Sequence, residues 1–216
     1  MKLGITLSKK AIDKIISYEV GSQALYNKKY THPVWPGGES GVTIGIGCDL
    51  GYQTKEGLIK DWTGMVSNSD LQLLLSVVGL KGIAAKNAIP KVKNVSVSYH
   101  DAEEIFLNEE VYKYSKIMLA NFPGVQELFA DCQGAILSLV FNRGGLVDST
   151  DRRREMKAIK SLIPTKDYKA IAAQFRSMKR LWDEKTARGL IIRREDEALL
   201  VEKCVRAYLD TELISI

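Results

Sequence analysis

The segment at residues 41–52, GVTIGIGCDLGY, constrains the fold of this chain more than any other. Apolar residues alternate within it with small or polar ones, the period of two that is typical of a β-strand. Thr43 and Asp49 share a parity, but the six-residue step between them spans roughly 20 Å of extended chain. The two side chains can therefore act together only if the chain bends at Gly45 and Gly47. The ordinary alternative is a glycine-rich edge strand followed by a turn aspartate.

A glutamate upstream lies on the apolar face of a predicted helix. The helix is expected to begin after Ser8 and to end at Gly21, and Glu19 shares a face with four apolar residues, Ala11, Ile12, Ile15 and Ile16. Burial disfavours the charged form of a carboxyl group, so a glutamate in such a place is a candidate general acid. The alternative is that Glu19 caps a turn or pairs with a nearby lysine.

The rest of the chain predicts helices in a single α+β domain. We expect one domain over residues 1–216, with a small β-containing region at about 20–53 and a helical lobe at about 54–216. The most apolar helical pattern predicts a central buried helix at residues 125–142. Thr54 and Ser69 are the expected caps of short helices. Further helical patterns cover residues 98–121, 151–162, 165–178 and 189–209.

Charge and cysteine content narrow the classes of function. The 31 basic and 26 acidic residues give a net charge of +5, which favours anionic partners but also fits a solvated surface. The 3 cysteines and 2 histidines form no metal-ligand spacing, so we expect neither a zinc site nor a disulfide framework, and no cofactor. No apolar run approaches the ~20 residues that cross a bilayer. The first residues have no apolar core of signal-peptide length.

Four elements together resemble the phage-type lysozyme family. In that family an N-terminal helix ends in the catalytic glutamate, a hairpin carries a T-x-G-x-G run, and late F-N-x-G and G-L-x-x-R-R patterns mark the helical lobe. The matching elements here are Glu19, residues 43–47 (TIGIG), residues 141–145 (FNRGG) and residues 189–195 (GLIIRRE). The resemblance spans most of the chain. It implies a lysozyme-like fold, with a cleft between the β element and the helical lobe.

The order of the acidic residues departs from the common phage order of Glu, Asp and Thr. Residues 20–42 contain no aspartate, and Asp49 instead follows Thr43. This order resembles the catalytic domain of pesticin, a bacteriocin related to these lysozymes. The resemblance therefore gives the acid role to Glu19, the water-positioning role to Thr43 and the base role to Asp49. Glu39 is the alternative base, although its Gly- and Pro-rich loop is typical of an exposed turn residue.

The resemblance implies a muramidase that hydrolyses the β-1,4 bond between N-acetylmuramic acid and N-acetylglucosamine in peptidoglycan. Tyr52 and Asn142 are the expected substrate-binding residues. Inversion needs carboxyl groups roughly 6.5–9.5 Å apart and retention about 5–5.5 Å, and the resemblance favours inversion. We expect a monomer made in the bacterial cytoplasm that acts on the cell wall, with neither a nucleic-acid partner nor stable membrane insertion. It would be a phage endolysin that depends on a holin, or an exported toxin with an immunity protein.

Two other functions fit the same residues. A lytic transglycosylase needs the glutamate but no water-activating base. A non-catalytic helical protein that binds cell wall or nucleic acid needs neither. Residues 66–97 exceed a minimal phage lysozyme and predict helices without a functional assignment.

Overall fold

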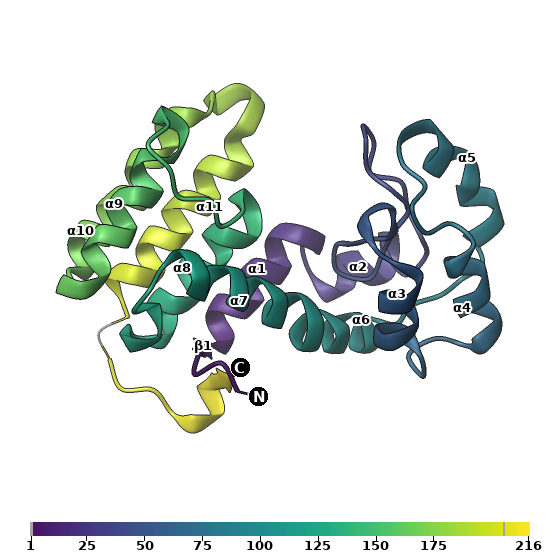
Figure 1. Ribbon diagram of the computed structural model, residues 1–216, viewed down its shortest axis with the longest axis horizontal. Coiled ribbons are helices and arrows are strands. Elements are labelled where there is room, and N and C mark those ends of the chain that lie inside the picture. The colour runs from purple at the N-terminus through teal and green to yellow at the C-terminus, as the bar shows by residue number, and fades with distance from the viewer. Residues whose placement is uncertain (1, 205) are drawn as a thin grey trace. The chain divides into compact units, whose positions relative to one another are not determined.

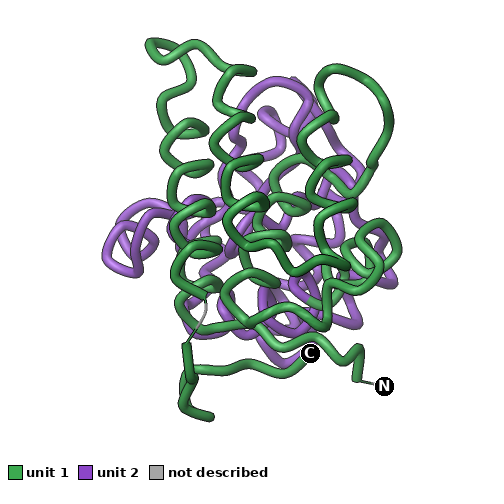
Figure 2. The backbone as a smooth tube through the Cα atoms, turned by 90° about the vertical axis from the view of Figure 1, so that its left-hand side faces the viewer, with its two compact units in different colours: residues 1–15, 112–216 green, residues 16–111 purple. Residues whose placement is uncertain are grey.

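The computed structural model describes residues 2–204 and 206–216 and divides into two compact units, which Figure 2 colours separately. The terminal unit comprises Met1–Ile15 and Tyr112–Ile216, and the hairpin unit comprises Ile16–Val111. The described chain is mostly helical, with two small two-stranded antiparallel sheets, which confirms the prediction of helices with a minor β component. The predicted β-containing region ends near residue 53, whereas the unit that holds the hairpin continues to Val111.

Both ends of the chain meet in the terminal unit. Strand β1 (Thr6–Ser8) pairs antiparallel with β4 (Leu213–Ser215), and Figure 1 marks both termini beside this sheet. The hydroxyl of Ser8 accepts a hydrogen bond from the backbone N–H of Ala11 at 3.1 Å, which satisfies a donor at the start of α1 (Lys9–Val20). The predicted start of this helix is therefore confirmed.

Helix α8 (Ala130–Arg143) forms the core of the terminal unit, and its residues 130–140 are all buried. This confirms the predicted central helix, but the helix begins later than residue 125 because Val125–Glu127 form a short 3-10 turn. Gly134 allows close approach, since a Cβ there would lie 2.2 Å from the Cβ of Ala11. The other long helices of this unit are α7 (Tyr112–Asn121), α9 (Arg154–Leu162), α10 (Tyr168–Ser177) and α11 (Glu184–Glu202).

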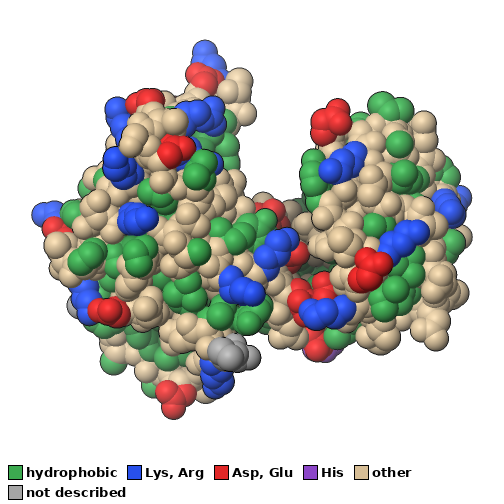
Figure 3. All heavy atoms as spheres, in the orientation of Figure 1, with side chains coloured by type: hydrophobic (Ala, Val, Ile, Leu, Met, Phe, Trp, Pro, Cys, Tyr) green, Lys and Arg blue, Asp and Glu red, His purple; other side chains and the backbone are tan. Residues whose placement is uncertain are grey.

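Ion pairs join the helices at residues 154–202, where α9, α10 and α11 lie side by side in Figure 1. Glu195 of α11 accepts hydrogen bonds from Arg176 and Lys179, the first at 2.9 Å. Figure 3 shows acidic and basic side chains interspersed on the face that it displays, so the net charge of +5 is not gathered there into one field.

The hairpin unit packs short helices around a small hairpin. Thr54 caps α3 as predicted, whereas Ser67 rather than Ser69 caps α4, because its hydroxyl accepts from the N–H of Asp70. The predicted helical stretch at 98–121 contains a π-helical segment, Phe106–Val111. The helices and strands of this unit are α2 (Gln23–Lys29), β2 (Thr43–Ile44), β3 (Cys48–Asp49), α3 (Lys55–Trp62), α4 (Asn68–Leu75), α5 (Gly82–Val92) and α6 (Tyr99–Ile105).

None of the helices in the described residues has the length and apolar character needed to cross a membrane.

Candidate functional site

The glycine-rich segment folds as a hairpin, not as the continuous strand that its period of two suggests. Thr43 of β2 pairs directly with Asp49 of β3. Gly45 and Gly47 make the bend with φ values of 58° and 77°, which residues other than glycine rarely adopt. The bend that the reach of the chain requires is therefore confirmed. Directly opposed residues of an antiparallel pair lie on one face, with Cβ atoms about 4.5–5.5 Å apart.

Glu19 and Thr43 line the same pocket, and every residue that lines it belongs to the hairpin unit. Glu19 lies in the last turn of α1, and a Cβ at Gly47 would be 4.0 Å from its Oε2. The carboxyl group therefore faces the turn of the hairpin. The cavity has a volume of about 450 Å³, which suits a small ligand. Its remaining lining residues are Val20, Tyr30, Val34, Trp35, Pro36, Gly45 and Gly47.

The hydroxyl oxygen of Thr43 is buried and has no hydrogen-bond partner among the residues that the structure describes. Leaving such a group unpaired costs about 1–3 kcal/mol. A water molecule that accepted from or donated to Oγ1 would remove this cost, since bound waters commonly satisfy buried polar groups. The water-positioning role of Thr43 stays a prediction, because its hydroxyl oxygen is closed to solvent in this structure.

The carboxylate of Asp49 is occupied by the backbone around it. Its Oδ1 accepts from the N–H of Gly41 at 2.9 Å and from that of Gly51 at 2.8 Å, and its Oδ2 accepts from Gly41 at 3.1 Å. A carboxylate offers about four acceptor positions, so about one remains. Asp49 lies opposite Thr43 in the hairpin but is not among the residues that line the pocket of Glu19. These bonds make Asp49 a clamp on the segments before and after the hairpin.

Glu39, the alternative base, also lies outside the lining of this pocket. It is exposed, and its Oε2 is 3.5 Å from the position that a Cβ on Gly82 would take. Gly82 begins α5, and a negative charge near the first turn of a helix is stabilising. The surroundings of Glu39 thus suit an exposed residue beside a helix start.

The two predicted substrate-binding residues lie in different units. Tyr52 is 65% exposed, and the ammonium nitrogen of Lys81 lies 3.5 Å from the centre of its ring. Asn142 is half-buried in the last turn of α8, in the terminal unit. Neither Tyr52 nor Asn142 lines the pocket of Glu19.

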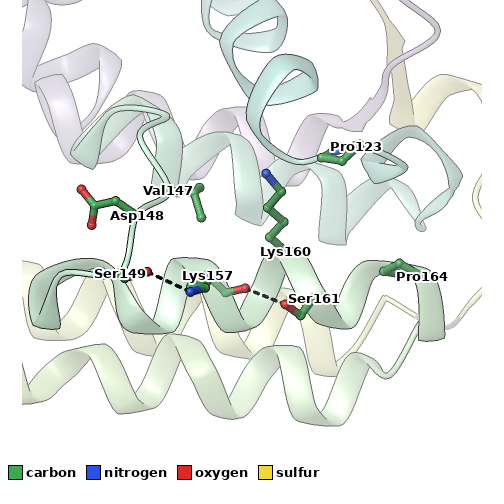
Figure 4. A pocket seen from close by; sticks show the side chains of 8 residues that line it. All are labelled: Pro123, Val147, Asp148, Ser149, Lys157, Lys160, Ser161 and Pro164. Carbon is green, nitrogen blue, oxygen red and sulfur yellow. Dashed lines mark hydrogen bonds between the residues drawn. The ribbon is translucent and has the colours of Figure 1, made fainter.

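A second cavity of about 450 Å³ lies in the terminal unit between α9 and two loops (Figure 4). The ammonium group of Lys157 donates to the hydroxyl of Ser149 at 2.9 Å. The carboxylate of Asp148 accepts from the N–H and hydroxyl of Thr150, and Figure 4 shows it turned away from Lys160. Because the carboxylate of Asp148 is engaged in this way, this cavity is a weaker candidate for acid catalysis than the pocket of Glu19. Nowhere in residues 2–204 or 206–216 do three or more His, Cys, Asp or Glu side chains gather as around a metal ion.

Sequence comparison places the chain in a family through a match that covers most of the hairpin unit and the first part of the terminal unit. Residues 18–129 match a family described as a domain of unknown function (DUF8812), and they make up just over half of the 216 residues. The chain belongs to this family. The DUF8812 region contains Glu19, Thr43 and Asp49, whereas Asn142 lies outside it. No curated protein matches the chain in sequence.

The periodicity of the sequence does not reveal the clamp formed by Asp49. One local spacing does indicate it. Asp49 is followed two residues later by Gly51, the spacing at which an aspartate accepts from the backbone of its own turn. The bond to Gly41 carries no such signal, because that residue precedes Asp49 by eight positions.

Proposed function

We propose that this protein is a muramidase of lysozyme-like fold that hydrolyses the glycan strands of peptidoglycan. One observation carries the proposal: Glu19 and Thr43 line one pocket at a glycine-bent hairpin, and the buried hydroxyl of Thr43 has no hydrogen-bond partner among the described residues. A helix with a glutamate in its last turn, a small hairpin and a mostly helical chain also support a lysozyme-like fold.

In the proposed reaction Glu19 donates a proton to the leaving glycosidic oxygen. The hydroxyl of Thr43 holds a water molecule on the other side of the sugar. Asp49 lies opposite Thr43 in the hairpin and would accept the proton of that water through its remaining acceptor position. The aromatic rings of Tyr30 and Trp35 line the pocket and would contact the sugar. The biological setting would be that of a phage endolysin or an exported antibacterial toxin acting on the cell wall.

A lytic transglycosylase is the second candidate. Glu19 is the only carboxylate among the described residues that line the pocket, and Asp49 already accepts three hydrogen bonds. A transglycosylase needs one acid and no water-activating base, so a pocket with a single carboxylate suits this reaction as well.

The test uses purified protein and isolated peptidoglycan, with the products identified by mass spectrometry. We expect muropeptides with reducing N-acetylmuramic acid ends, and their loss in Glu19→Gln with an unchanged circular dichroism spectrum. Glu39→Gln is the matched control, since this exposed glutamate of the same unit lies outside the pocket and should leave product formation intact.

Each other outcome points to a different function. Anhydro-muramyl ends would replace hydrolysis by transglycosylation. Binding to the wall without any product, or salt-sensitive DNA binding instead, would favour a non-catalytic binding protein.

A further inference from the structure

Three arginines gather beside the C-terminal end of α8, and we name Arg143, Arg152 and Arg153 the arginine cluster. The guanidinium of Arg143 donates to the backbone carbonyl of Arg152 at 2.5 Å. Burial, followed by the positive charges of Arg153, Arg194 and Arg152, lowers the pKa of Arg143 to about 10. Like charges are thus held together here against their mutual repulsion.

The nearby carboxylates are engaged by other cations. Arg180 donates to Glu155 at 2.7 Å and also to Asp151, and Arg154 pairs with the same two acids. Glu155 also accepts from Ser177.

Two further acids of the terminal unit are engaged as well. Glu197 is buried and accepts from Arg194 at 2.7 Å. Asp148 attracts Arg153, but its carboxylate is hydrogen-bonded to Thr150. In the described part of the chain, no carboxylate forms an ion pair with a member of the arginine cluster.

Arg143 also carries a buried donor without an acceptor. Its Nη1 is inaccessible to solvent and makes no hydrogen bond with residues 2–204 or 206–216, whereas such groups in folded proteins are nearly always paired. The partial negative charge at the end of α8 favours a cation there, and the ring of Trp182 lies 5.4 Å from the guanidinium carbon. Neither feature accepts the hydrogen atoms of Nη1 or balances three positive charges.

We propose that the arginine cluster binds an anionic oxygen group, a carboxylate or a phosphate, on a ligand of the terminal unit. A guanidinium presents its N–H donors in a planar fork that matches both groups, and charge-assisted hydrogen bonds of this kind are strong. This part of the inference rests on the proposed function: the anionic group belongs to the cell-wall polymer. It is either a carboxylate of the peptide stem or a phosphate of a wall phosphodiester.

The test measures binding separately from cleavage, by calorimetric titration of the Glu19→Gln protein. The probes are inorganic phosphate, a soluble muropeptide with free stem carboxylates, and the same muropeptide with those carboxylates amidated. Arg143→Gln should weaken binding of the recognised probe at least about tenfold, the scale of one charge-assisted hydrogen bond. Arg188→Gln is the matched control, because this exposed arginine of the same unit should change binding less than about twofold.

A second variant tests the proposal independently, in case replacement of the half-buried Arg143 disturbs folding. Arg152→Gln combined with Arg153→Gln leaves α8 unchanged and should weaken binding by a similar factor. Loss of binding on amidation identifies a carboxylate, and binding of phosphate alone identifies a phosphate group. Equal binding by the parent protein, Arg143→Gln and the double variant, or no binding of any probe, would overturn the proposal. Anion binding by a protein that cleaves no peptidoglycan would leave the site standing and reject only the proposed function.

Discussion

The clamp formed by Asp49 makes a prediction that is independent of any enzymatic activity. Asp49→Ala removes the acceptor of two N–H groups, those of the buried residues Gly41 and Gly51. An unpaired buried donor costs about 1–3 kcal/mol, so the free energy of unfolding should fall by about 2–6 kcal/mol. Asp49→Asn keeps the Oδ1 acceptor, which makes the bonds of 2.9 and 2.8 Å, and should lose only about 1 kcal/mol.

The assay is urea unfolding followed by tryptophan fluorescence in a Trp182→Phe background. The remaining tryptophans, Trp35 and Trp62, both lie in the hairpin unit and report on its unfolding. The Ala and Asn variants should differ by more than about 1 kcal/mol, since only Ala loses every acceptor. If Asp49→Ala unfolds within about 0.5 kcal/mol of Asp49→Asn, the clamp does not stabilise the hairpin and the reasoning is wrong.

Three further predictions address the site and the terminal unit. Thr43→Val should leave stability unchanged or slightly raised, because the lost hydroxyl has no partner, yet it should abolish product formation in the peptidoglycan assay. Asp49→Asn should lower the rate of a muramidase by about 10²–10⁴, the contribution of a general base, whereas a rate near that of wild type favours the transglycosylase. Hydrogen bonds from Lys179 and then Arg176 outweigh burial and hold the pKa of Glu195 below its usual range. This stabilisation should persist above pH ~4.3 and disappear as pH falls through the lower folded-state pKa, so melting curves of Glu195→Gln and wild type should converge in acid.

Local pattern and chain reach predicted part of this structure. The central helix followed from its apolar composition, because a helix surrounded by others is apolar on all sides. The bend at Gly45 and Gly47 was predicted because an extended chain would hold Thr43 and Asp49 too far apart to contact one water molecule. Both arguments use only neighbouring residues, which is why both were accessible from the sequence.

The features that could not be predicted depend on contacts between residues that are not neighbours in the sequence. The terminal unit joins both chain ends through two strands of three residues each, too short for a period of two to stand out. The clamp of Asp49 depends on the approach of Gly41, where a Cβ would lie 2.4 Å from Oδ1. The arginine cluster brings Arg143 to the backbone of Arg152 across a loop. None of these contacts leaves a periodic trace in the sequence.

The most direct test of the central claim is the mass of the products released from peptidoglycan by wild type and by Glu19→Gln. If Glu19 is the acid in the pocket that Thr43 also lines, wild type releases muropeptides with reducing muramic acid ends and Glu19→Gln releases none. Unchanged product release by a folded Glu19→Gln protein would contradict the account.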